Sequence, residues 1–243
     1  MKNLTEIVFI LDKSGSMAGM EQDTIGGYNA FLQKQKEEEG DALVSTVLFS
    51  NDSYVLHDRF NIKTVQPITD LEYVVGGCTA LLDAIGKAVH HISNVHKYIR
   101  QEDVPDKTIF VITTDGLENA SHEYSIDDVK QLITKMREEK GWEFLFVAED
   151  LNAVETAAKM GIPSDRAAYY SARQDTGRMY CAMSACVSNV RAEKRIDPEW
   201  QRNIREKDVI KPDAREQERE RRRQRLAQNA AQKQNASNDT DNN

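Results

Sequence analysis

The stretch IVFILDKSGSM, residues 7–17, begins as an apolar strand and ends in a cluster of small oxygen-bearing side chains. Five apolar residues open the stretch, and Asp12, Ser14 and Ser16 follow them within five residues. Aspartate and serine favour turns because their side chains hydrogen-bond to the nearby backbone. The same side chains also suit a catalytic nucleophile or a metal site, so the stretch alone leaves three interpretations open.

Apolar runs alternate with amphipathic stretches along most of the chain. The apolar runs predict strands at residues 6–12, 42–50, 53–60, 107–115, 142–150 and 167–170. Helical spacing predicts helices at residues 23–39, 79–99, 125–141, 152–163 and 175–195. The polar, alternating segment 53–60 indicates an edge strand. This order predicts an α/β fold, a doubly wound, mainly parallel six-stranded sheet with helices on both faces.

Glycines and capping residues refine two of these helices. Ser125 is expected to cap the third helix at its N-terminus, and Gly141 is expected to end it. Gly26 and Gly27 lie inside the first helix, where each costs about 1 kcal/mol relative to alanine. We expect these two glycines to allow close packing of the helix on the sheet.

The apolar pattern fades towards the C-terminus, so we expect a folded domain at residues 1–195 and a charged tail at residues 196–243. The end of the tail has almost no large apolar side chain and cannot bury enough surface to order itself in a core. Three tail glutamates each stand three residues before an arginine, a spacing that stabilises an exposed helix. The tail is therefore expected to be partly helical or disordered.

Charge is distributed unevenly over these two parts. The chain has a formal net charge of −8, but residues 1–200 carry 21 basic and 32 acidic side chains, whereas residues 201–243 carry 11 and 8. The acidic part disfavours general nucleic-acid binding, because nothing would neutralise phosphate repulsion. Contact with nucleic acid or an acidic partner stays open only for the tail.

The number and spacing of the cysteines and the character of the N-terminus indicate the cellular compartment of the protein. Cys78, Cys181 and Cys186 form an odd set without CxxC spacing, which argues against a disulfide framework and for a reducing compartment. The N-terminus has no apolar signal-peptide core, and no stretch approaches the roughly 18 apolar residues of a membrane span. We expect a cytoplasmic protein without a membrane partner.

Polar residues follow two of the predicted buried strands, which end at Asp12 and Asp115. Parallel strands bring their carboxyl ends to the same edge of a sheet, where ligands bind. Thr79 follows two glycines, whose backbone freedom lets its loop approach the other two. Together Asp12, Ser14, Ser16, Thr79 and Asp115 offer only oxygen, the donor that hard divalent cations such as Mg²⁺ prefer.

In combination, these segments resemble the metal-ion-dependent adhesion site (MIDAS) of von Willebrand factor type A (vWA) domains. DKSGSM at residues 12–17 matches the D-x-S-x-S element, GGCTALLDAIG at 76–86 resembles the threonine loop, and ITTDGLEN at 112–119 resembles the second aspartate loop. The strand and helix pattern fits the same fold over residues 1–195. The arrangement is similar to small stand-alone bacterial or phage members of that family.

The resemblance implies roles for the five residues. Ser14 and Ser16 would bind Mg²⁺ directly, Thr79 directly or through water, and Asp12 and Asp115 largely through water and hydrogen bonds; Mn²⁺ and Ca²⁺ are alternative ions. An open coordination position would receive an Asp or Glu carboxylate from a partner protein. We therefore expect a metal-dependent protein-binding module and not an enzyme.

Two other functions stay open for this sequence. A phosphatase with an aspartate nucleophile would fit the strand, the Mg²⁺ and Asp12, but Ser14 stands where such enzymes carry a second aspartate. A serine nucleophile would need a positioned base, and SGSM is not a G-x-S-x-G elbow. Alternatively, the protein is a scaffold that acts through its Arg/Glu-rich tail while the metal is structural.

The histidines and Cys78 are not expected to be metal ligands. His90, His91 and His96 lie on one predicted helix without the i,i+4 spacing of a zinc pair, so we expect packing or surface roles. His122 follows Asp115 and is a candidate for the border of the site. Cys78 stands directly before Thr79, where a hard-ion site does not require a cysteine. We interpret it as a residue that contributes to packing or as a thiol that can be oxidised.

Overall fold

The computed structural model describes residues 3–149, 151–170, 172–197 and 199–205 of the chain. The strands are β1 (Leu4–Asp12), β2 (Asp41–Phe49), β3 (Ser53–Asn61), β4 (Lys107–Thr114), β5 (Glu143–Ala148) and β6 (Ala167–Tyr169). The α-helices are α1 (Glu21–Glu37), α2 (Leu81–Tyr98), α3 (Ile126–Lys140), α4 (Ala153–Lys159), α5 (Ala172–Arg191) and α6 (Trp200–Arg205). Each predicted strand and helix is present, and α6 is an addition to the prediction.

The six strands form one sheet in the order β3-β2-β1-β4-β5-β6. Neighbouring strands pair in parallel except for β3, which is antiparallel to β2 at one edge. The chain builds outward from β1 to β3 and then crosses to β4 on the other side of β1. The strand order therefore reverses between β1 and β4, which is where open α/β sheets bind ligands. The predicted doubly wound, mainly parallel six-stranded sheet is confirmed.

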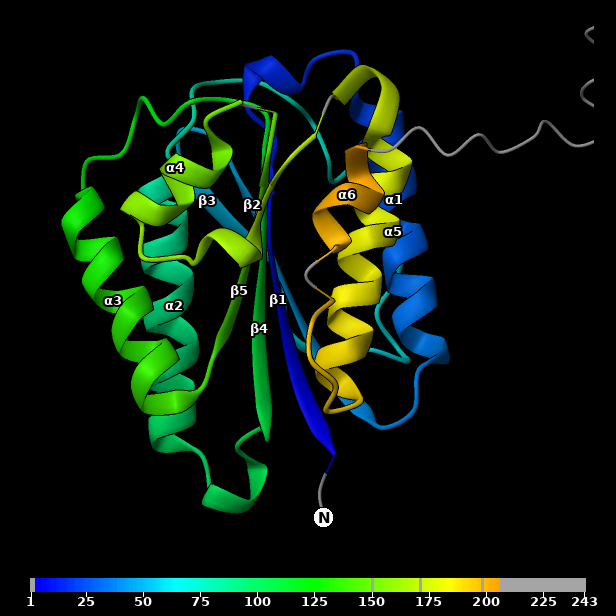
Figure 1. Cartoon of the computed structure of the whole chain (residues 1–243), viewed down its shortest axis with the longest axis vertical. Helices are drawn as coiled ribbons and strands as arrows, with labels where there is room; N and C mark the ends of the chain where they lie inside the picture. The colour runs from blue at the N-terminus through cyan, green and yellow to red at the C-terminus, as the bar shows by residue number, and fades with distance from the viewer. Residues whose placement is uncertain (1–2, 150, 171, 198, 206–243) are drawn as a thin grey trace, which may run out of the picture. The chain divides into compact units, whose positions relative to one another are not determined.

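Helices cover both faces of the sheet (Figure 1). One face carries α1, α5 and α6, and the other carries α2, α3 and α4. Successive side chains of β1 point to opposite faces, so Phe9 packs with α1 and α5 whereas Val8 and Ile10 pack with α2. Burial on both faces explains why β1 is a continuous apolar run rather than an alternating one.

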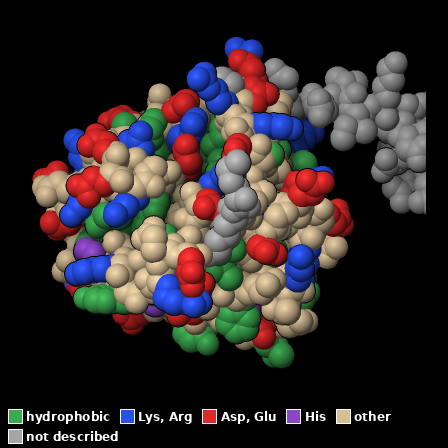
Figure 2. Space-filling view, turned by 90° about the horizontal axis from the view of Figure 1, so that it is seen from below, with side chains coloured by type: hydrophobic (Ala, Val, Ile, Leu, Met, Phe, Trp, Pro, Cys, Tyr) green, Lys and Arg blue, Asp and Glu red, His purple; other side chains and the backbone are tan. Residues whose placement is uncertain are grey.

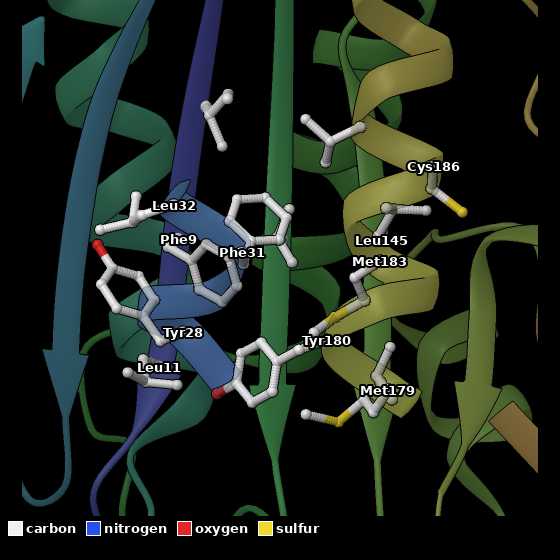
Figure 3. Close-up of a cluster of buried hydrophobic side chains, with 14 of the residues drawn as sticks. Phe9, Leu11, Tyr28, Phe31, Leu32, Leu145, Met179, Tyr180, Met183 and Cys186 are labelled. Carbon is white, nitrogen blue, oxygen red and sulfur yellow. The ribbon is translucent and has the colours of Figure 1, made fainter. Parts of the chain in front are cut away.

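Aromatic side chains join α1 and α5 to the central strand. The ring of Phe9 meets Tyr28 and Phe31 of α1 edge-on, with centroid distances of 5.1 and 5.0 Å. Tyr180 of α5 stacks beside the same ring at 6.3 Å (Figure 3). These contacts fix two helices against β1 and so fix the position of the loop that leaves its carboxyl end.

The end signals predicted for α3 are confirmed. Ser125 accepts a hydrogen bond from the backbone N–H of Asp128, whose side chain in turn accepts from the backbone of Ser125, forming a capping box. Gly141 ends the helix in the left-handed conformation with φ 65°, which glycine adopts without a steric penalty.

The two glycines of α1 behave differently from each other. A Cβ on Gly27 would lie 2.1 Å from Cδ2 of Tyr180, whereas a Cβ on Gly26 would have no atom within 4 Å. Close packing therefore applies to Gly27 alone, and its partner is α5 rather than the sheet. The sequence shows the two adjacent glycines but does not predict which helix packs against them.

The compact unit continues ten residues beyond the boundary expected after residue 195, to Arg205. Ile196, Trp200 and Ile204 are buried and belong to the core beside α5. Three apolar residues spaced by four in a polar segment are too few to reveal a packed turn in the sequence. The remainder of the expected tail, residues 206–243, lies outside the described residues.

The surface is strongly polar. Figure 2 looks onto the end of the molecule where β1 begins, and acidic and basic side chains are interspersed there.

None of the described helices combines the length and the apolar character that crossing a membrane requires. Cys78, Cys181 and Cys186 are all free thiols.

Alanine at the two glycines of α1 should change stability in opposite directions. Gly27→Ala should lower the free energy of unfolding by about 1–3 kcal/mol, because the new methyl group overlaps the buried Tyr180 ring. Gly26→Ala should raise it by about 0.5–1 kcal/mol, because alanine favours the helix and the site is open. Urea unfolding of both variants measures this; equal effects of the two substitutions would contradict the packing described.

Candidate metal centre

Asp12 is the last residue of β1 and its side chain is fully buried. One carboxylate oxygen, Oδ1, accepts the backbone N–H of Ser14 at 2.7 Å. The other, Oδ2, accepts the hydroxyl of Thr114, the last residue of β4, at 2.6 Å. Asp12 therefore ties the loop after β1 to the end of the neighbouring strand.

The two serines extend this connection to Asp115. A short 3₁₀ helix (Gly15–Met17) turns the loop so that Ser16 faces β4. The hydroxyls of Ser14 and Ser16 lie 3.0 Å apart, and the hydroxyl of Ser16 donates to Oδ1 of Asp115 at 2.7 Å. The predicted meeting of the first and last of these loops is thus present, although Ser16 and Asp115 are 99 positions apart in the chain.

Thr79 comes from a third loop and reaches the same space. Its side chain is buried, and no described residue forms a hydrogen bond with its hydroxyl. A Cβ placed on Gly116 would lie 2.9 Å from Oγ1 of Thr79 and 3.1 Å from Oγ of Ser16. Both hydroxyls therefore border one small volume beside Gly116, which a side chain at that position would fill.

Charge is unfavourable in this volume without a cation. Burial raises the pKa of Asp115 to about 6; the hydrogen bond from Ser16 opposes the rise, and the Asp12 and Glu149 carboxylates add to it. Burial also raises the pKa of Asp12, against the hydrogen bonds that it accepts. A nearby positive charge would favour the ionised form of both carboxyl groups.

The donor set fits a hard divalent ion. Two carboxylates and three hydroxyls converge, Thr79 has an uncommitted oxygen, and the charge balance calls for a cation; Mg²⁺ prefers such oxygen ligands and usually keeps several waters. In the described part of the chain, no three His, Cys, Asp or Glu side chains cluster so as to hold a metal ion. A metal site built from the five candidate residues would therefore draw on hydroxyl oxygens as well as carboxylates.

The hydrogen bonds of the four candidate histidines go to residues other than the five proposed ligands. His90, His91 and His96 contact Tyr124, Asp58 and Glu6 respectively, three different partners. His122 is exposed, and its backbone N–H donates to Asp83 of α2 at 2.9 Å. Cys78 is exposed, and its backbone N–H donates to Asn51.

Several supporting residues escape the sequence pattern. Thr114 binds Asp12, and the hydroxyl of Tyr73 donates to the carbonyl oxygen of the same aspartate. Asp83 accepts the backbone N–H groups of three consecutive residues, 122–124, at 2.8–2.9 Å, and so holds the loop after β4 to α2. The sequence offers only a weak signal for Asp83, an acidic residue in the first turn of a helix.

Comparison with known proteins gives matches in structure only. No protein-family model matches the chain, and no curated protein matches its sequence. Proximal thread matrix protein 1 from the mussel byssus is 14% identical, with a TM-score of 0.52 over 75% of this chain and 46% of that one. The D319A mutant of the PilB minor pilin from Streptococcus sanguinis is 11% identical, with a TM-score of 0.53 over 76% and 62%.

Identities this low establish the fold and nothing further. The chain has a vWA-like α/β fold. It spans less than two thirds of the length of both proteins named above. The vWA-like arrangement of strands and helices is the one expected from the sequence.

Replacing Asp83 tests how the loop after β4 is held. Burial works to raise the pKa of Asp83, but the three backbone donors outweigh it and the pKa is lowered. A carboxyl group with a lowered folded-state pKa stabilises the protein above its unfolded pKa of about 3.9, and this stabilisation is lost as pH falls through the folded pKa. Asp83→Asn should therefore cost about 1–3 kcal/mol at pH 7, because the amide cannot accept all three N–H groups.

Thermal unfolding of wild type and Asp83→Asn between pH 3 and pH 7 measures this effect. The difference in free energy of unfolding should shrink as the pH approaches 3. A difference that is independent of pH would show that the carboxylate charge is not what holds the loop.

Proposed function

We propose that this chain is a metal-dependent protein-binding module. Asp12, Ser14, Ser16, Thr79 and Asp115 would hold Mg²⁺, with Mn²⁺ or Ca²⁺ as alternatives, and the ion would bind a carboxylate from a partner protein. The observation that carries the proposal is the position of the Thr79 hydroxyl. It forms no hydrogen bond with a described residue and borders the same space as Ser16.

The composition of the site supports a carboxylate as the partner group. Three of the five donors are neutral hydroxyls, so an ion held there would keep much of its positive charge for an incoming anion. Mg²⁺ takes near-octahedral coordination, and five protein donors, some of them acting through water, leave room for an external ligand. Residues 1–200 carry a net charge of −11, so an acidic partner would be repelled wherever no cation stands between the two.

Exposed apolar side chains on the surrounding loops support a protein as the partner. The loop before α2 exposes Leu71 and Val74, the loop after β4 exposes Leu117, and the loop after β5 exposes Leu151. Exposed apolar side chains mark a protein-binding site where they form a contiguous patch. They would contribute contact area around a central carboxylate that the ion binds.

Metal binding is tested on chelator-treated full-length protein. Adding Mg²⁺ at about 100 times its dissociation constant should stabilise the fold by about 2.7 kcal/mol, seen as a rise in the unfolding temperature. Ser14→Ala should abolish most of this rise, because it removes one donor without burying a new charge. Ser93→Ala, which changes a serine of α2 away from the site, is the matched control; no rise in wild type would exclude the metal site.

Partner binding is tested by affinity capture with the full chain in Mg²⁺ and in EDTA. A partner that is captured only with Mg²⁺, and is lost with Ser14→Ala, would support the proposal. Capture that survives EDTA but is lost when residues 206–243 are deleted would favour the scaffold that acts through its tail. Mg²⁺-dependent turnover of a generic phosphate ester, lost in Asp12→Asn, would favour a phosphatase.

A further inference from the structure

Thr79 supplies the one hydroxyl of the site that has no hydrogen-bond partner in the described part of the chain, and its backbone is held from both sides. Towards β4, its N–H donates to Oδ1 of Asn119 at 2.9 Å, and its carbonyl oxygen accepts the backbone N–H of Asn119 at 3.1 Å. One asparagine thus satisfies both backbone groups of Thr79. Because both of its backbone groups bond to Asn119, the backbone of Thr79 is restricted in its rotation.

The turn between β2 and β3 holds the residues on either side of Thr79. The N–H of Cys78 donates to Oδ1 of Asn51 at 2.5 Å, and the N–H of Ala80 donates to the carbonyl oxygen of Ser50 at 2.8 Å. Three consecutive N–H groups, those of residues 78–80, therefore point at fixed acceptors on two different loops.

A glycine makes the contact with Asn51 possible. Gly77 has φ 85°, a left-handed conformation that favours glycine, and a Cβ there would lie 2.8 Å from Oδ1 of Asn51. Its carbonyl oxygen also accepts the backbone N–H of Gly15, in the serine loop, at 2.9 Å. The same short segment is thereby joined to the loop that carries Ser14 and Ser16.

The loop after β4, which carries Asn119, is itself held to the start of α2 by hydrogen bonds. Oε2 of Glu118 accepts the N–H of Leu82, and Oε1 accepts the N–H groups of Ala120 and Ser121, each at 2.8–2.9 Å. The hydroxyl of Ser121 accepts the N–H of Asp83. The bonds to Leu82 and Asp83 join the loop that contains Asp115 to the start of α2. The bonds to Ala120 and Ser121 lie within that loop and stabilise its conformation.

We infer that Asn119 and Asn51 are positioning residues for the metal site, and this inference rests on the proposed function. They hold the backbone of the threonine loop, and with it the Thr79 hydroxyl, beside Ser16. Neither asparagine is proposed as a ligand. Both act through the backbone of residues 78–79.

The chain offers a matched control for Asn119. Asn29 of α1 also binds both backbone groups of one loop residue, but with its side chain alone: its Oδ1 accepts the N–H of Ile68 at 2.9 Å, and its Nδ2 donates to the carbonyl oxygen of Ile68 at 2.8 Å. Asn29→Ala removes two loop hydrogen bonds, whereas Asn119→Ala removes only the side-chain bond to Thr79 and keeps the backbone one. Asn29→Ala is therefore at least as disruptive to a loop, but it leaves the five proposed ligands untouched.

The test is Mg²⁺ titration by isothermal calorimetry on the full chain, together with the unfolding temperature of each chelator-treated variant. Asn119→Ala and Asn51→Ala should each weaken Mg²⁺ binding about 10- to 100-fold, the usual effect of removing a group that orients a ligand. Asn119→Asp keeps the acceptor for the Thr79 N–H, so it should weaken Mg²⁺ binding less than Asn119→Ala does. Asn29→Ala should lower the unfolding temperature while Mg²⁺ affinity stays at the wild-type value.

The outcomes separate this inference from the proposal on which it rests. Wild-type Mg²⁺ affinity in both Asn119→Ala and Asn51→Ala would overturn the positioning role while leaving the metal site in place. Equal weakening by Asn29→Ala would overturn it as well, because the effect would then be general loosening of loops. If wild type binds no Mg²⁺, the proposed function fails, and the inference fails with it.

Discussion

The parallel pairing of β1 with β4 is the constraint on which the rest of the structure depends. Leu11 lies opposite Thr113, so the strands end at the same level, with Asp12 and Thr114 as their last residues. The carboxylate of Asp12 then accepts the hydroxyl of Thr114 across this pair. A shift of one residue in the pairing would turn these side chains to opposite faces of the sheet.

The site combines close approach of three loops with an electrostatic imbalance. Small residues permit the approach: a Cβ on Gly15 would lie 3.2 Å from the carbonyl oxygen of Gly77, and one on Gly116 would meet both Thr79 and Ser16. The raised pKa values of Asp12 and Asp115 show that burial opposes their charge. Carboxyl groups with perturbed pKa values are typical of functional sites.

Polar residues in the loop after β4 serve the geometry of the site rather than its chemistry. Glu118, Asn119 and Asp83 all accept backbone N–H groups across the junction between this loop and α2. Such contacts replace the regular hydrogen bonds that irregular backbone cannot make with itself. They make the exposed end of the sheet an ordered surface, on which apolar side chains such as Leu117 stay accessible.

The sequence by itself determined the class of fold, because continuous apolar runs and helical spacing reflect burial that each segment carries locally. It also singled out the five oxygen-bearing residues, since each stands at the end of a strand or the start of a helix. Only the tertiary structure decided what depends on contacts between distant segments. Gly27 faces Tyr180, Trp200 returns to the core, and Asn119 holds Thr79, because each partner is brought close by the crossing of elements and not by spacing along the chain.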